Sequence, residues 1–209
     1  MKIKKLLHAF SLLLICIAMV SAMSCKKDED DNNDDTNNDS INNNNNNPQL
    51  AIGQSYQGGI IAYILQSGDP GYVSGETHGI IAAPSDQNTG VVWNNGSFTA
   101  TSATSEYDGK TNTNTIVNVQ GAGNYAAKIC YDLVLGGYSD WYLPSKQELI
   151  KLYTNRASIG GLPGNYYWSS TEYSPAGAGN AWFYFTGSPG YPHYGNKENT
   201  YYVRAVRSF

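Results

Sequence analysis

A run of polar residues between positions 26 and 49 limits which part of this chain can fold. Asparagine and aspartate make up most of the run, and its two lysines and seven acidic residues give it a net charge of −5. A segment of this composition buries too little apolar surface to offset the conformational entropy lost on ordering. We therefore predict that residues 25–49 form a disordered, extended tether and that the folded part of the chain is residues 50–209.

The residues before the tether have the pattern of a secretory signal peptide. Three lysines near the amino end precede an apolar run at residues 6–20, and small residues follow. A helix that spans a bilayer needs about 20 apolar residues, so this run is short for a permanent span. We predict that residues 1–24 are a signal peptide.

The cysteine after this segment indicates a lipid anchor. Ala22-Met23-Ser24-Cys25 resembles the lipobox read by bacterial lipoprotein signal peptidases, although Met23 departs from its strictest form. The resemblance implies a diacylglyceryl group on the Cys25 thiol and acylation of the new amino terminus. Two or three chains give stable membrane attachment, whereas one binds only marginally. The alternative is an ordinary secreted protein cleaved nearby.

The residues after Cys25 bear on the location of the protein. Lys26 and Lys27 are followed at once by four acidic residues. This order resembles the surface-export signal of Bacteroidetes lipoproteins, which implies an outer-membrane lipoprotein facing the cell exterior. A periplasm-facing lipoprotein with a solvated linker is the alternative.

Residues 50–209 have the composition of one folded domain. They hold all seventeen tyrosines and all four tryptophans, and a segment of this length suits a single core. Eight basic and ten acidic residues give a net charge of −2, so we expect no nucleic-acid partner. Cys130 is the only cysteine of the segment, which excludes an internal disulfide, and its position on the apolar side of a helical pattern predicts a buried residue.

Hydrophobic periodicity predicts an α+β domain. The capping box Ser145-Lys146-Gln147-Glu148 begins a helix that continues through Tyr153, and residues 125–135 fit a second helix. Apolar runs bounded by turn residues predict strands at residues 59–65, 78–83, 166–171, 181–186 and 201–208. Long loops are expected at 84–112, with a short strand at 91–93, and at 186–200, and a short helical segment at 114–119.

Four sequence blocks resemble a known family. They are Gly136-Gly-Tyr-Ser-Asp-Trp-Tyr-Leu-Pro-Ser-Lys-Gln-Glu-Leu149, Tyr167-Trp-Ser-Ser-Thr-Glu-Tyr173, Ala181-Trp182 and Val203-Arg-Ala-Val-Arg207. In this order they resemble the domain family named after the C-terminal part of the Legionella collagen-like adhesin, and residues 52–59 and 81–87 fit it as well. The layout is also similar to the C-type-lectin-like fold. That similarity implies short twisted antiparallel strands, two main helices and long loops, with amino- and carboxyl-terminal strands that pair.

The residues within these blocks are interpreted as scaffold. Truncating a core aromatic residue costs about 3–5 kcal/mol, so large apolar groups next to turns and strands favour a structural role. Arg204 and Arg207 are expected to pair with Glu172 or Asp140. The residues assigned to this structural motif are Trp141, Leu143, Pro144, Trp168, Trp182, Arg204 and Arg207.

No set of catalytic groups is visible in the domain. His78 and His193 are far apart in sequence, with no cysteine or paired carboxylate at zinc-ligand spacing. A nucleophile elbow, a phosphate-binding loop and a dinucleotide motif are missing, as are the calcium-binding motifs of lectins. We therefore predict a domain that is not an enzyme and has no catalytic residue, metal site or cofactor, although its oxygen-rich loops leave room for structural calcium.

A tyrosine-rich segment at residues 186–200 is the candidate for ligand binding. Tyrosine rings offer flat amphipathic faces that stack on sugars or anchor protein partners at small entropic cost. The alternative is that these rings cover the edge of the domain's own core. The candidate ligand-binding residues are Tyr173, Tyr191, His193, Tyr194 and Lys197, with Tyr107 expected at the same end of the domain.

Two functions remain open from the sequence. The first is a surface-exposed lipoprotein whose domain binds a glycan or a protein in recognition or adhesion, without catalysis. The second is a structural or accessory subunit of a cell-envelope complex.

Overall fold

The computed structural model describes residues 49–209, which belong to one compact unit. The predicted signal peptide, the lipidation of Cys25 and nearly all of the predicted tether lie outside the described residues. The described part of the chain contains four α-helices and nine strands in two sheets, which confirms the α+β class. Within residues 49–209, no helix is both long and apolar enough to cross a membrane.

The first sheet combines the earliest strands with the last one. It is antiparallel, in the order β1 (Ser55–Tyr56), β2 (Gly59–Ile64), β3 (Gly79–Ala82) and β9 (Val206–Ser208). Gln57 and Gly58 form the turn between β1 and β2 with φ angles of 44° and 83°, a conformation that glycine adopts without strain. A side chain at Gly58 would also meet the backbone of Gly136. The amino- and carboxyl-terminal strands thus share a sheet, although β9 pairs with β3 and not with β1.

The second sheet carries the remaining strands. Its order is β4 (Asn88–Val91), β8 (Tyr201–Val203), β5 (Tyr166–Glu172), β6 (Asn180–Phe185) and β7 (Tyr191–Asn196). β5 and β8 are parallel and the other neighbours are antiparallel. A 3₁₀ helix, η1 (Ser174–Gly179), connects β5 to β6, and β7 forms one edge of the sheet.

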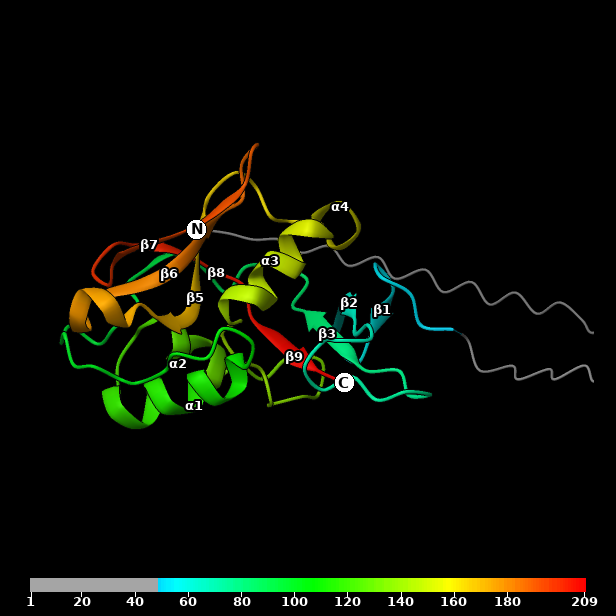
Figure 1. The fold of residues 1–209 in the computed structure, drawn as a ribbon, viewed down its shortest axis with the longest axis horizontal. Coiled ribbons are helices and arrows are strands. Elements are labelled where there is room, and N and C mark those ends of the chain that lie inside the picture. Colours follow the sequence, from blue (N-terminus) through cyan, green and yellow to red (C-terminus); the bar gives the residue numbers. More distant parts are fainter. Residues whose placement is uncertain (1–48) are drawn as a thin grey trace, which may run out of the picture. The chain divides into compact units, whose positions relative to one another are not determined.

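Four helices pack around these sheets: α1 (Gly109–Gln120), α2 (Ala126–Tyr131), α3 (Lys146–Thr154) and α4 (Arg156–Ile159). Asp108 caps α1 by accepting the backbone amide of Thr111 at 2.9 Å. Ser145 and Glu148 form the predicted capping box of α3, because each side chain accepts the backbone amide of the other residue. α3 contacts strands of both sheets, and Figure 1 shows it between them.

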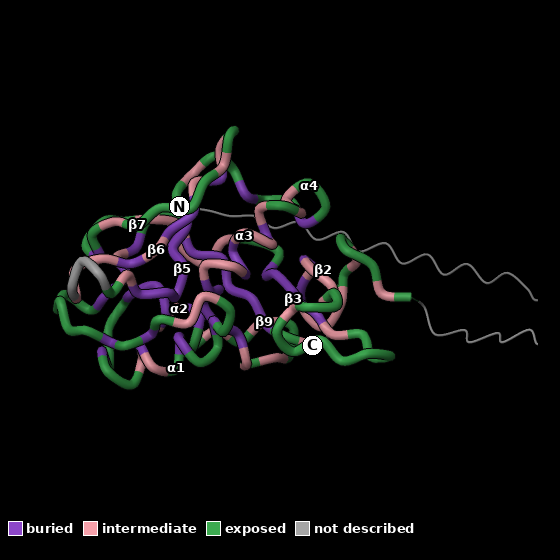
Figure 2. The backbone as a smooth tube through the Cα atoms, viewed as in Figure 1, coloured by how far each residue is buried: buried purple, intermediate pink, exposed green. Residues whose placement is uncertain are grey.

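Two hydrophobic clusters fill the interior, and Figure 2 shows buried backbone running through β3, β5 and β9. The buried indoles are satisfied: Trp168 donates to the carbonyl of Val91 at 2.9 Å, and Trp93 donates to that of Ser169 at 2.8 Å. Cys130 is fully buried, as predicted, and burial raises the pKa of its thiol. Six of the seven residues of the structural motif are buried: Trp141, Leu143, Pro144, Trp168, Arg204 and Arg207.

The two motif arginines hold the carboxyl-terminal segment to the rest of the domain. Arg207 forms a bidentate pair with Asp140, at 2.7 and 3.0 Å, one of the pairings expected from the sequence. Arg204 pairs with Asp86 instead, and its guanidinium also donates to the carbonyls of Ala83 and Gly161. The single strand predicted at 201–208 is therefore wrong. β8 ends at Val203 and β9 begins at Val206, so the chain changes sheets where Arg204 turns inward.

The predicted loops also contain regular structure. α1 begins at Gly109, inside the stretch expected as a loop, and it is longer than the predicted segment at 114–119. The segment 186–200 is not a single loop, because residues 191–196 pair with β6 along its whole length. This pairing brings the candidate tyrosines onto a β-hairpin.

Candidate ligand-binding surface on the β6–β7 hairpin

The hairpin formed by β6 and β7 carries aromatic side chains on both of its faces. Its cross-strand pairs include Trp182 with Tyr194, Phe183 with His193, and Phe185 with Tyr191. Because successive residues of a strand point to opposite faces, the first pair lies on one face and the other two pairs lie on the other.

The first face holds a three-ring cluster of Tyr173, Trp182 and Tyr194. The rings of Tyr173 and Tyr194 are stacked, with centroids 3.8 Å apart and an interplanar angle of 7°. Trp182 meets both rings edge-on, at 5.3 Å from Tyr173 and 5.8 Å from Tyr194. Partial burial and the neighbouring Tyr194 raise the pKa of Tyr173. The cluster therefore presents mutually oriented aromatic rings.

A lysine and a glutamate fix the edge of this cluster. The ammonium group of Lys146, at the start of α3, lies 4.0 Å from the centre of the Trp182 ring, a cation–π contact. The same group donates to the carboxylate of Glu106 at 2.8 Å. That hydrogen bond lowers the pKa of Glu106. The cluster is thus bordered by a partly exposed ion pair that can also hydrogen-bond to a ligand.

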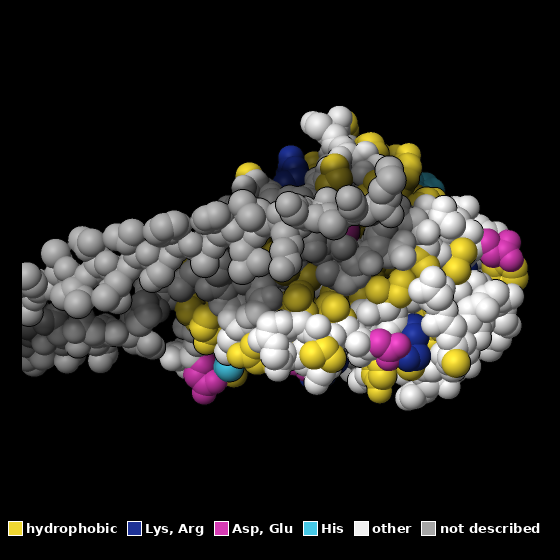
Figure 3. Space-filling view, turned by 180° about the vertical axis from the view of Figure 1, so that it is seen from behind, with side chains coloured by type: hydrophobic (Ala, Val, Ile, Leu, Met, Phe, Trp, Pro, Cys, Tyr) yellow, Lys and Arg dark blue, Asp and Glu magenta, His cyan; other side chains and the backbone are white. Residues whose placement is uncertain are grey.

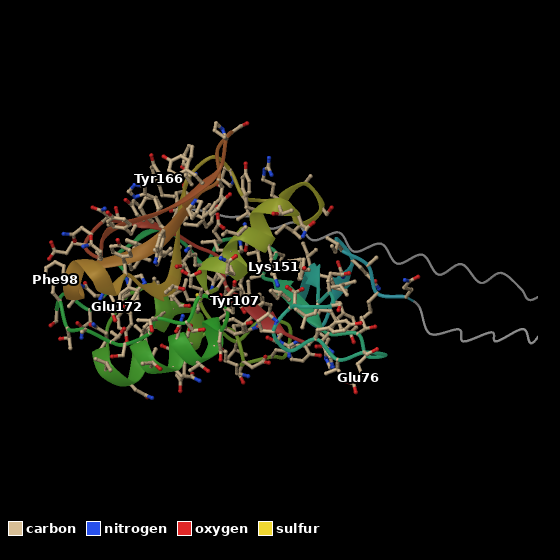
Figure 4. The ribbon with its side chains drawn as sticks, viewed as in Figure 1. Glu76, Phe98, Tyr107, Lys151, Tyr166 and Glu172 are labelled. Carbon is tan, nitrogen blue, oxygen red and sulfur yellow. The ribbon has the colours of Figure 1, made fainter. Side chains whose placement is uncertain are left out.

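The second face carries a more exposed group of rings. Tyr191 and Tyr166 are 42% and 40% exposed, and His193 is also exposed. The ring of Phe185 lies between the tyrosines, 5.0 Å from Tyr166 and 5.3 Å from Tyr191. Figure 4 shows Tyr166 on the outer side of the sheet near this hairpin. Phe183 beneath is buried, so the exposed rings rest on the core.

The structure places four of the five candidate ligand-binding residues at the hairpin, in two pairs on its opposite faces. Tyr173 and Tyr194 lie on the first face, and Tyr191 and His193 lie on the second face or its edge. Trp182, expected as scaffold, is only half-buried and belongs to the first face. Alternation along β6 did not reveal this, because Tyr184 lies on the same face as Trp182 and is buried.

Lys197 is the exception, and its prediction as a ligand contact is wrong. Its side chain has no solvent exposure, its ammonium group pairs with the buried carboxylate of Glu172, and it lies 4.3 Å from the centre of the Trp93 ring. The other oxygen of that carboxylate accepts the backbone amides of Thr101 and Ser102 at 2.9 and 2.8 Å. Burial lowers the pKa of Lys197. Through Glu172, this lysine therefore links the end of β7 to the loop before α1.

Tyr107 lies at a different place from the hairpin. It lines a cavity of about 440 Å³, and no residue of the hairpin lines that cavity. In Figure 4, Tyr107 lies near Lys151 and apart from Tyr166. Sequence reasoning missed this cavity because its lining comes from five separated stretches of the chain.

Charged groups are sparse on the surface. On the described part of the face in Figure 3, acidic and basic side chains occur singly or in small groups among uncharged ones. Within residues 49–209, no group of three or more histidine, cysteine, aspartate or glutamate side chains is placed to hold a metal ion.

The described residues form an α+β domain whose β6–β7 hairpin carries exposed aromatic rings. The chain belongs to the Lcl C-terminal domain family, whose family model matches residues 83–207, and this is a family of adhesin-like domains. The match begins after β3, so it does not include the resemblance expected for residues 52–59. No curated protein matches the chain.

Proposed function

We propose that the chain is an outer-membrane lipoprotein, anchored through Cys25 and facing the cell exterior, whose domain acts in adhesion. In this proposal the domain is not an enzyme, and it binds a glycan or protein partner through the β6–β7 hairpin. The observation that carries the proposal is the stacking of Tyr173 on Tyr194 against Trp182 on one face of the hairpin; Tyr191 is exposed on the other face. Preorganised aromatic rings lose little entropy on binding, and such rings are enriched among residues that dominate binding energy.

Membership of an adhesin-like family supports this proposal, because it gives the same class of function on grounds independent of the hairpin. The sparse surface charge fits a contact made mainly by apolar and hydrogen-bonding groups. The lipid anchor and acidic tether inferred from the sequence provide a way to hold such a domain away from the membrane.

Binding by the purified full-length chain to a glycan array and to immobilised extracellular-matrix proteins tests the proposal. Tyr194→Ala and Tyr191→Ala should each weaken binding about tenfold or more, since the loss of a central aromatic contact costs at least ~1.4 kcal/mol. Tyr131→Ala is the matched control, because Tyr131 is an equally exposed tyrosine on α2. Binding that is at background, or that both hairpin variants leave unchanged, would contradict the proposal.

The second candidate, an accessory subunit of an envelope complex, is favoured by one observation. β7 is the edge of its sheet and is largely exposed, so its outer backbone groups are free to pair with a strand of a partner. Pro192 in the middle of β7 limits the length of such pairing. Cross-linking in intact membranes separates the two functions, because an accessory subunit gives one stoichiometric partner and an adhesin does not.

We also propose the finer fold assignment, a C-type-lectin-like domain. It is supported by the sheet that joins β9 to the first strands, and by the Trp141-Tyr-Leu-Pro144 segment that leads into α3. Superposition of an experimental structure on members of that fold is the test, and a different strand order in the second sheet would contradict it.

A further inference from the structure

The cavity lined by Tyr107 lies between the start of α1, the outer side of α3 and the carboxyl-terminal end of β9. Its volume of about 440 Å³ falls within the range of sites that bind small molecules, roughly 300–1,000 Å³. Ile80, Leu65 and Phe209 supply apolar wall, and Tyr107 stands at the rim with 55% of its surface exposed.

The floor of the cavity is polar, and its polar groups already form hydrogen bonds within the protein. The hydroxyl of Tyr142 donates to the carboxylate of Glu148 at 2.9 Å and lies 2.9 Å from the hydroxyl of Ser208. The other carboxylate oxygen accepts the backbone amides of Ser145 and Gly109, at 2.7 and 3.1 Å. Burial raises the pKa of Glu148. This carboxylate therefore stabilises the start of α3, and its hydrogen bonds are complete without a cationic group from a ligand.

The charges around the cavity are balanced. Lys151 pairs with Asp69 at 2.8 Å. His78 is held 2.7 Å from Glu76, and that hydrogen bond raises the pKa of the imidazole. The rim adds one charge of each sign, from Lys110 and Asp108. Glu148 on the floor adds one carboxylate, which hydrogen bonds within the protein already satisfy. An anionic ligand would thus meet no excess of positive charge, so the lining favours a neutral ligand over an anion.

The rim also provides hydrogen-bonding groups of both kinds. The amide of Gln147 is a donor and an acceptor, the hydroxyl of Ser208 is both, the ammonium of Lys110 donates and the carboxylate of Asp108 accepts. A compact ligand that carries many hydroxyls, and that has one apolar face for an aromatic ring, matches this combination of groups.

We propose that this cavity binds a neutral monosaccharide unit, whose apolar face lies against Tyr107 and whose hydroxyls hydrogen-bond to Gln147, Ser208, Lys110 and Asp108. The proposal goes beyond adhesion through the hairpin, because none of these residues belongs to β6 or β7. It gives the domain a second, partly open subsite for a single sugar.

Saturation-transfer NMR on the full-length chain, in a detergent without a sugar head group, tests the proposal. The probes are free glucose, galactose, mannose and N-acetylglucosamine, with glucuronate as the anionic comparator. We expect at least one neutral sugar to give transfer and glucuronate to give less. Tyr107→Ala and Gln147→Ala should each raise the Kd of that sugar about tenfold, as expected for the loss of one central contact.

Two further variants separate this cavity from the hairpin. Tyr194→Ala and the control Tyr131→Ala should leave the transfer to the neutral sugar unchanged. The proposal is overturned if no neutral sugar gives transfer, if glucuronate gives the stronger signal, or if Tyr107→Ala and Gln147→Ala both leave the Kd unchanged. If only Tyr194→Ala abolished the transfer signal, the cavity proposal would be wrong and sugar binding would be assigned to the hairpin. If the glycan array showed no binding while the NMR transfer remained, only the proposed function of the hairpin would be contradicted. Tyr107 and Gln147 lie at the surface, and circular dichroism checks that both variants fold.

Discussion

Lys197 and Glu172 form an ion pair within the domain, with side-chain exposures of 0% and 4%. Taking both charges out of water is costly, and their mutual attraction offsets that cost only because further hydrogen bonds complete the site. Here the backbone amides of Thr101 and Ser102 and the ring of Trp93 supply those contacts. The pair therefore contributes specificity, by joining β5, β7 and the loop before α1 in one arrangement.

Lys197→Met should destabilise the domain by about 3 kcal/mol or more, because it leaves the Glu172 carboxylate buried without its cation. The measurement is the free energy of unfolding in urea. Lys128→Met is the matched control, since Lys128 pairs with Asp132 on the surface and such pairs contribute at most about 1 kcal/mol. Equal destabilisation by the two substitutions would contradict the assigned role of Lys197.

Asp140 should make the stability of the domain depend on pH in the acid range. The hydrogen bonds from Arg207 outweigh burial and lower its pKa below the ordinary value of 3.8. A carboxyl whose pKa is lower in the folded state stabilises that state above the unfolded pKa, and this stabilisation is lost as the pH falls through the folded pKa.

Asp140→Asn should accordingly reduce stability at neutral pH and flatten the fall in stability below about pH 4. Urea unfolding at pH 7 and at about pH 3 measures both effects. Parallel curves for the two proteins across this range would show that Asp140 makes no contribution to acid unfolding.

At the scale of elements, the strongest local signals in the sequence predicted the fold well. The apolar runs became β2, β3, β5 and β6, and the capping box became the start of α3. These features depend on neighbouring residues only, through side-chain alternation and a hydrogen bond between positions three apart.

The elements that were missed depend on distant contacts. α1 has a sequence rich in asparagine and threonine, which are weak helix formers. It forms because Thr113 exchanges hydrogen bonds with the backbone of Leu143, and because Asn112 donates to the carbonyl of Ser105. β7 contains proline and glycine and forms because β6 offers it a partner. Tertiary context decides both elements.

In the candidate site, too, some features follow from the local sequence and others depend on distant contacts. The composition of residues 186–200 made Tyr191, His193 and Tyr194 candidates for ligand contacts, but it left open whether they cover the core, and it could not place them on opposite faces of a hairpin. The stacking of Tyr173 on Tyr194 required the register of the hairpin, which no local pattern contains. Lys197 was misassigned because its buried partner, Glu172, lies 25 residues earlier in the chain.

At the scale of the whole molecule, the proposed anchor and tether would let the domain extend away from the membrane. If residues 25–49 behave as a flexible chain, their ends are separated by roughly 25–30 Å, and repulsion between the acidic groups extends them further. In the proposed arrangement, a tether of that length would hold the domain away from the membrane surface.

Proteinase treatment of intact cells tests this arrangement. We expect the wild-type domain to be lost from the cells while a periplasmic marker stays intact, because the proposed tether exposes the chain on the outer side. Cys25→Ala, which removes the acylated thiol, should leave the protein out of the membrane fraction even before treatment, since no other membrane attachment is proposed for it. A wild-type domain that resists the proteinase until the outer membrane is opened would place the lipoprotein on the periplasmic face, and adhesion through the hairpin would then have no external ligand to act on.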